Sequence, residues 1–227
     1  MGWEGTGVVG GYHDLRAGGA GLYASPRYPT DPAAAEAFVA AQRHGTLIAT
    51  APDGYPQISI LPFVKTGERI ELHCVQADPT LATVRANPRV TFLVSDFLAF
   101  SPHAWIDPLD AGRATLHFRA VAYECDATVS TDPAEVAATL GRLLAAYEPD
   151  ARYSPLVDGE PYAERLRRLA ALRLTVVRMH AKFKVGPAAP PADARERVVR
   201  GLRQRAQPGD ARAADVIQTA IDASRDG

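Results

Sequence analysis

The chain has 227 residues, the length of one elaborated domain or two small ones. Its hydrophobic content of 47% is enough for a core, and its formal charge of −1 argues against a basic nucleic-acid surface. No apolar run of about 18 residues predicts a membrane span, and we expect no secretory signal. The two cysteines, Cys74 and Cys125, lie far apart, which argues against a zinc site or disulfide and favours a cytoplasmic protein.

The first residues differ in character from the rest. Residues 1–21 are rich in glycine and lack hydrophobic periodicity. We therefore expect a flexible leader over 1–21 and a single domain over 22–227 that ends in helices. Order should begin near Tyr23.

Three predicted helices each begin at an Asp-Pro pair. An aspartate at this position can accept a hydrogen bond from a free backbone N–H, and proline fits the first helical position. These helices begin at Asp31, Asp78 and Asp132 and extend to about Arg43, Ala86 and Tyr147. Further helices are predicted at 161–169, 193–204 and 210–224.

Between the helices, short apolar or alternating segments are separated by turns and predict strands. The predicted strands are 46–50, 57–64, 69–75, 90–94, 99–106, 113–126 and 172–179, the last continued by 182–185. In 69–75, alternation puts Leu72 and Cys74 on one face and Glu71 and His73 on the other. The expected fold class is α+β, predominantly β, with a β-barrel and peripheral helices.

Several segments resemble the PaiB-type proteins. Leu72–Thr80 is similar to that family's G-H-V-A-R-A-N-P-Q, Pro102–Pro108 to its P-H-A-Y-[IV]-S-P, and Lys182–Val185 to its K-W-K-L. The likeness runs from about residue 22 to 205. It implies an FMN-binding split barrel of the pyridoxamine-phosphate-oxidase type, forming a homodimer with cofactor sites at the subunit interface.

Several departures from that pattern remove flavin-holding groups. Gln76 replaces an arginine that could bind a phosphate, Ile60 replaces a histidine, and Leu116 replaces a tryptophan. A more apolar site with nearby histidines suits haem b better than FMN, which remains the alternative. The chain resembles the haem-dependent piperazate synthases, a branch of this family that closes N5-hydroxyornithine into a cyclic hydrazine.

The resemblance and the residue types together predict the site. His73 is the expected iron ligand, with His103 as its competitor, although either could be structural. Lys65, His103 and His117 are candidate acids or bases, and Lys65 could instead be a solvated turn residue. The expected cofactor-binding residues are His73, Gln76, Thr80, Arg85, Arg89 and Lys182.

Two other functions remain open from the sequence. One is an FMN-binding PaiB-like oxidoreductase, and the other is a negative transcriptional regulator. Acidic residues balance the arginines of the C-terminal helices, so nucleic-acid binding is the weaker expectation.

Overall fold

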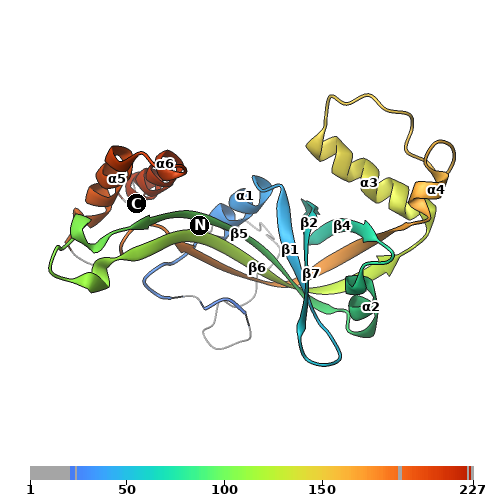
Figure 1. Ribbon diagram of the computed structural model, residues 1–227, viewed down its shortest axis with the longest axis horizontal. Coiled ribbons are helices and arrows are strands. Elements are labelled where there is room, and N and C mark those ends of the chain that lie inside the picture. The colour runs from blue at the N-terminus through green and yellow to red at the C-terminus, as the bar shows by residue number, and fades with distance from the viewer. Residues whose placement is uncertain (1–20, 24, 189–190, 224, 226–227) are drawn as a thin grey trace, which may run out of the picture.

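The computed structural model describes residues 21–23, 25–188, 191–223 and 225. Seven strands form one antiparallel sheet in the order β2-β1-β5-β6-β7-β4-β3 (Figure 1). The strands are β1 (His44–Thr50), β2 (Pro56–Pro62), β3 (Val64–Thr66), β4 (Arg69–Val75), β5 (Arg89–Ser101), β6 (Thr115–Ser130) and β7 (Leu169–Lys184). The helices are α1 (Pro32–Ala40), α2 (Pro79–Ala86), α3 (Pro133–Tyr147), α4 (Ala163–Leu166), α5 (Ala194–Arg205) and α6 (Asp210–Ala223), with 3₁₀ turns η1 (His103–Trp105) and η2 (Ala111–Arg113).

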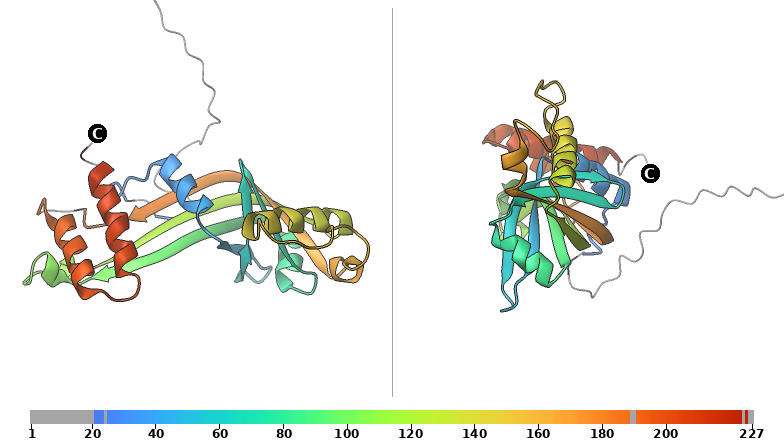
Figure 2. Two further views of the ribbon diagram at one scale, coloured as in Figure 1. Left: turned by 90° about the horizontal axis from the view of Figure 1, so that it is seen from above. Right: turned by 90° about the vertical axis from the view of Figure 1, so that its right-hand side faces the viewer.

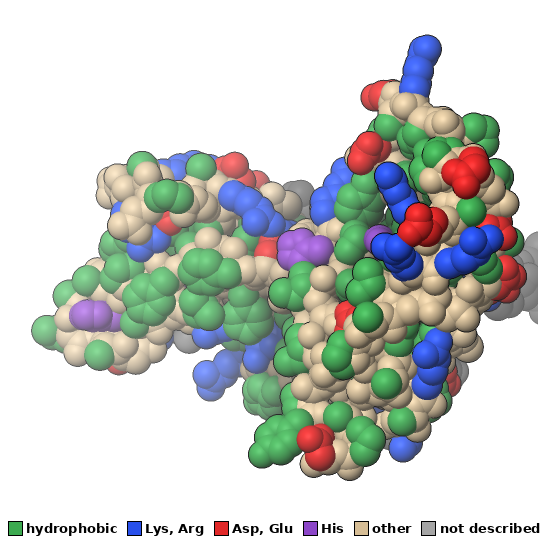
Figure 3. Space-filling model, turned by 45° about the vertical axis from the view of Figure 1, so that its right-hand side comes forward, with side chains coloured by type: hydrophobic (Ala, Val, Ile, Leu, Met, Phe, Trp, Pro, Cys, Tyr) green, Lys and Arg blue, Asp and Glu red, His purple; other side chains and the backbone are tan. Residues whose placement is uncertain are grey.

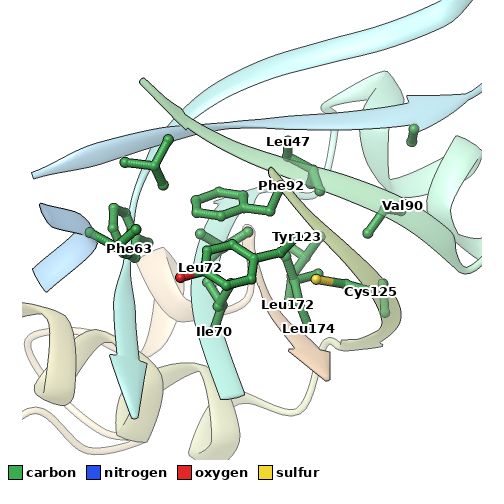
Figure 4. Close-up of a cluster of buried hydrophobic side chains, with 14 of the residues drawn as sticks. Leu47, Phe63, Ile70, Leu72, Val90, Phe92, Tyr123, Cys125, Leu172 and Leu174 are labelled. Carbon is green, nitrogen blue, oxygen red and sulfur yellow. The ribbon is translucent and has the colours of Figure 1, made fainter. Parts of the chain in front are cut away.

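One half of the sheet curls around an apolar core, and we call this half the barrel. Leu72 of β4, Phe92 of β5 and Tyr123 of β6 point into it and are fully buried (Figure 4). Phe63 packs edge-on against Phe92, with ring centroids 5.1 Å apart. The predicted α+β split barrel is therefore confirmed, and alternation along each strand decides which residues enter its core.

The other half of the sheet is a long extension that we call the arm. It consists of the distal parts of β5 and β6, joined through η1 and η2, together with the end of β7. Helices α5 and α6 cover the inner face of the arm, and α3 lies at the opposite end of the molecule (Figures 1 and 2). A separate cluster that includes Leu98, Val198 and Ile217 joins the arm to α5 and α6.

Several sequence predictions about this region are wrong in detail. The separate strands expected at 90–94 and 99–106 are one strand, β5, which continues through a register shift between Phe97 and Ala99. Pairing with β6 holds that continuity, and Pro102, which has no N–H, ends it. The strand expected at 57–64 breaks at Phe63, and the helix expected at 161–169 shortens to α4. The expected leader lies outside the described residues except for Gly21.

Candidate cofactor site

His73 lies on the outer side of β4, opposite the core residues Leu72 and Cys74. Its ring is half-buried, and its Nδ1 is inaccessible to solvent and has no hydrogen-bond partner in the described chain. Burial lowers the pKa of His73 below its ordinary value of 6.5. The ring is therefore neutral near pH 7, the form in which imidazole binds a metal.

A partly buried ion pair links α3 to this part of β4. The Arg142 guanidinium donates to both carboxylate oxygens of Glu71, at 2.6 and 2.7 Å, and Glu71 is 4% exposed. Glu71 precedes His73 by two residues, so the two side chains share the outer side of β4. The pair therefore controls how α3 lies beside His73.

Gln76 and Thr80, two predicted cofactor-binding residues, are engaged with the protein itself. The Gln76 amide donates to the carbonyl oxygens of Arg167 and Leu169, at 2.9 and 3.0 Å. The buried Thr80 hydroxyl lies 2.6 Å from the Ser59 hydroxyl, which ties α2 to β2. Their side chains thus hold the strand end in place, and only a rearrangement would free them for a ligand.

The arginines near α2 remain open to solvent. Arg85 lies in the last turn of α2 and Arg89 opens β5, and both are exposed. Neighbouring Cys74 is buried, and burial, followed by the charge of Asp78, raises the pKa of its thiol to about 12. The Cys74 thiol is therefore protonated and a poor metal ligand. Arg85 and Arg89, by contrast, are exposed and can reach an anionic group.

The side chain of Lys65 is engaged by two hydrogen bonds within the protein. Its Nζ donates to Glu36 Oε2 and to the Gly67 carbonyl, both at 2.7 Å. It also lies 5.4 Å from the centroid of the Tyr123 ring. These contacts join α1 to the barrel and engage the amine that was predicted to act as a base.

His117 is enclosed in the distal part of the arm, beside the end of β5. Its side chain has no solvent exposure, and its Nδ1 accepts a hydrogen bond from the Gly186 N–H at 3.2 Å. The ring proton therefore sits on Nε2, which donates to Ser101 Oγ at 2.9 Å. Burial, with a smaller contribution from the Lys184 charge, lowers the pKa of His117 to about 4. Both ring nitrogens are thus committed to structural contacts.

His103 lies in η1 at the tip of the arm. It is half-exposed, and its ring makes no hydrogen bond with another described residue. Its backbone carbonyl accepts from Ile106 and Asp107, which closes the turn. Of the three predicted acids or bases, His103 is the one whose side chain makes no hydrogen bond with another described residue, so it is available to a ligand.

The outer face of the sheet carries large apolar side chains in solvent. Ile60 of β2 is 69% exposed, Phe97 of β5 is 62% exposed, and Phe100 and Leu116 are more than 40% exposed. Thr46 of β1 pairs with Ile60 of β2 and with Leu93 of β5, so this face continues from β2 to β5. Green side chains cover this surface of the arm in Figure 3. The exposed set, which we call the apolar outer face, is Ile58, Ile60, Phe97, Phe100 and Leu116.

Cationic side chains border the apolar outer face along β7. Lys182 and Lys184 pair across the sheet with Ala120 and Phe118. The Lys182 ammonium lies 4.9 Å from the Tyr23 ring centroid and 5.8 Å from that of Phe118. Lys184 and the exposed phenylalanines were not predicted as site residues. The alternation of 182–184 and the register shift at Phe97 explain why they point outward.

The predicted site residues fall into two groups far apart in one protomer. His73 pairs with Ala171 of β7, and Lys184 lies thirteen residues further along the same strand. At about 3.3 Å per residue, the two groups are separated by roughly 40 Å along β7. His73, Gln76, Thr80, Arg85 and Arg89 belong to the barrel, whereas His103, His117 and Lys182 belong to the arm. One protomer cannot bring both groups to a single cofactor.

Among the described residues, no group of three or more His, Cys, Asp or Glu side chains could hold a bare metal ion. Within the same residues, no helix is long and apolar enough to cross a membrane.

The curled antiparallel sheet and its peripheral helices define a split-barrel protein. The family model described as "Putative FMN-binding domain" matches residues 22–178, and the chain belongs to this family. A search of curated proteins found no match.

Solved structures share the fold at low sequence identity. Flavocytochrome Anf3 of Azotobacter vinelandii is 16% identical with a TM-score of 0.56, over 75% of this chain and 79% of that one. A FAD and haem binding protein of Mycobacterium smegmatis is 15% identical with a TM-score of 0.56, over 77% and 80%. A conserved hypothetical protein of Mycobacterium tuberculosis is 22% identical with a TM-score of 0.51, over 71% and 90%.

Proposed function

We propose that this chain is a haem-dependent enzyme that converts N5-hydroxyornithine to piperazate, with each haem held between two copies of the chain. The observation that carries the haem assignment is His73, a neutral, half-buried imidazole whose Nδ1 lacks a partner in the described chain. Two solved neighbours bind haem or are flavocytochromes by description, which supports the cofactor class. The substrate assignment rests on the sequence resemblance.

A second copy of the chain would bring together the barrel group and the arm group of predicted site residues, which we call the two half-sites. The apolar outer face exposes side chains that a monomer would leave in water, and such faces mark interaction surfaces. In a two-fold dimer, the arm of each protomer lies against the barrel of the other. The partner's Lys182, Lys184 and His103 would then face the same cofactor as His73.

The residues of the composite site suit haem. His73 would supply the imidazole that holds the iron, and Arg85, Arg89, Lys182 and Lys184 are the cations that could pair with the acidic side groups of the haem. When bound, the haem supplies a Lewis-acidic iron beside the substrate. The flavin alternative has less support at the barrel, because Gln76, where the family carries an arginine, is engaged with backbone carbonyls.

The proposed reaction is a dehydration without net redox change. The N–O bond of the hydroxylamine breaks, the N–N bond to the α-amine forms, and water leaves. The chain must bend the substrate so that its two nitrogens meet, since proximity lowers the barrier. The partner's His103 would take the proton from the α-amine and return it to the departing hydroxyl, because Lys65 and His117 are engaged elsewhere.

The absorption spectrum of the purified protein after haem addition tests the cofactor. We expect an intense Soret band, and we expect His73→Ala to lose it. His44→Ala, which changes an exposed histidine on β1, is the matched control and should retain the band. Binding of FMN without haem would reject the haem assignment, and full haem retention by His73→Ala would reject His73 as the iron ligand.

The oligomeric state tests the shared site. We expect a dimer by light scattering, and the double variant Phe97→Glu, Phe100→Glu should be a monomer that loses cofactor. Val157→Glu introduces the same charge at an exposed valine outside the apolar outer face and should remain dimeric. A monomeric wild type that binds cofactor fully would reject the shared site.

An FMN-binding oxidoreductase is the second candidate. The family match favours it directly, and Lys182 with Lys184 provides a cationic border for a phosphate. Binding of FMN with a typical two-band flavin spectrum, together with turnover of a reduced nicotinamide, would support this candidate.

A further inference from the structure

A second concave surface lies on the opposite side of the sheet from the proposed cofactor site. It is a groove of about 740 Å³ between α1 and α6, above the inner side of β6 and β7. This volume lies within the range of about 300–1,000 Å³ that is usual for organic ligands. We call it the helix groove.

Small side chains keep the walls of the helix groove apart. The wall residues are Ala34 and Ala37 on α1, Ala41 just after α1, and Val216, Ala220 and Ala223 on α6. Phe38 and Phe183 form the floor, with ring centroids 5.4 Å apart in an edge-on arrangement. The groove therefore offers an apolar channel for the body of a ligand.

The charged residues that line the groove are mainly cationic. They are Arg27, Arg119 and Arg195, against the single carboxylate of Asp31. The Asp31 carboxylate caps α1 by accepting from the Ala34 N–H at 2.8 Å. It is thus engaged with the helix, and the balance of the groove is positive.

Arg119 places a positive group in the floor. Its guanidinium lies 4.5 Å from the Phe38 ring centroid and forms two bonds with Asp96, the shorter at 2.6 Å. Asp96 also pairs with Arg212, so two guanidinium groups share one carboxylate. Arg195 uses its Nε to donate to the Pro187 carbonyl at 3.2 Å. The arginines near the apolar floor therefore carry more N–H donors and more positive charge than Asp96 can engage.

We infer that the helix groove binds an organic anion with an apolar body, such as a medium-chain carboxylate. The apolar body would lie between the alanine walls, and the carboxylate would pair with Arg195 and Arg119. This site is distinct from the proposed cofactor site because it uses the inner face of the arm. It therefore stands whether or not the haem assignment is correct.

Calorimetric titration of the full chain with octanoate tests this inference, with octanamide as the neutral probe of the same length. We expect octanoate to bind, and octanamide to bind about tenfold more weakly because it lacks the charge-assisted bonds. Arg195→Gln should abolish most of that preference while leaving octanamide binding unchanged. Ala220→Trp should remove octanoate binding by filling the groove.

Ala211→Trp is the matched control, since Ala211 is an exposed alanine of α6 that does not line the groove. It should bind octanoate like the wild type, and so should the double variant Phe97→Glu, Phe100→Glu of the outer face. If Ala220→Trp fails to fold, Ala37→Trp fills the groove from α1. Absence of octanoate binding to the wild type, or equal binding by the folded groove-filling variant, would overturn the inference.

Discussion

The barrel and the arm are stabilised in different ways. The barrel core is apolar, with Phe92 and Tyr123 fully buried among aliphatic side chains. The barrel also buries the Glu71 carboxylate, whereas the arm combines a smaller apolar cluster with the buried side chains of Asp210 and His117. Asp210 is 2% exposed and receives two bonds from Arg205, at 2.6 and 2.8 Å, while His117 is bonded at both ring nitrogens.

This difference indicates that the two regions have different roles, the barrel in folding and the arm in assembly. An apolar core is stabilised wherever the strands alternate correctly, whereas a buried ion pair requires that both partners arrive in position. Among the described residues, α5 and α6 cover the inner face of the arm, while its outer face carries exposed phenylalanines. We interpret the barrel as the self-sufficient part of the fold and the arm as the part shaped for a second copy.

The largest expected effect on stability comes from a substitution at Gly45 in the barrel. A Cβ at this position would lie 2.3 Å from Phe92 Cζ, and Phe92 is fully buried. Gly45→Ala should therefore lower the free energy of unfolding by about 3 kcal/mol or more. Gly141→Ala, where a Cβ meets nothing within 4 Å in α3, should instead raise it by up to about 1 kcal/mol. Denaturant unfolding of both variants checks this, and equal stabilities would contradict it.

Lowering the pH should reduce the free energy of unfolding through His117, which lies in the arm. Its pKa is about 4 in the folded chain, against 6.5 when unfolded, so the unfolded chain takes up a proton first as the pH falls. The stabilisation by neutral His117 is complete above pH 6.5 and is lost between about 6.5 and 4, at a cost of about 3 kcal/mol. His117→Gln lacks this titration and should lose less stability over that range. Parallel pH profiles of urea unfolding for the two proteins would contradict this.

A tight contact between α5 and the tip of the arm should be less sensitive than the one in the barrel. A Cβ on Gly201 would lie 2.4 Å from Trp105 Cδ2, but Trp105 is half-exposed and can shift outward. Gly201→Ala should therefore cost about 2 kcal/mol, less than Gly45→Ala. Because the shift moves η1, it should also change Trp105 fluorescence. A loss of stability larger than that of Gly45→Ala would show that the arm is the more rigid region.

The smallest effect is a gain of stability. Ala206 ends α5 with a left-handed backbone, at φ 51°, which costs a side chain more than it costs glycine. Ala206→Gly should therefore raise the free energy of unfolding by about 0.5 kcal/mol. A melting temperature that falls would contradict this.

Local signals in the sequence predicted much of the barrel. The three Asp-Pro pairs do cap helices, since Asp31, Asp78 and Asp132 accept from the N–H groups of Ala34, Thr80 and Ala134. Alternation in 69–75 correctly placed Leu72 and Cys74 in the core and His73 outside it. These features depend on neighbours in the chain, so the sequence alone is enough to predict them.

The state of the site residues depends on distant neighbours. Lys65 has the side chain of a possible base, but Glu36, twenty-nine residues earlier, pairs with it. His117 is buried on the face of β6 opposite the exposed Leu116, and its environment is made by Ser101 and Gly186. The continuity of β5 likewise depends on its register with β6. None of these pairings leaves a local signal in the sequence.

A mixed dimer tests the shared site most directly. His73→Ala removes the barrel half-site, and the double variant Lys182→Glu, Lys184→Glu removes the cationic border of the arm half-site. Each variant alone should lose cofactor. Random mixing of the two should restore about a quarter of the wild-type cofactor sites, because half of the dimers then carry one intact barrel–arm pair. Recovery of cofactor absorbance to that level is the predicted result, and no recovery in confirmed mixed dimers would contradict the shared site.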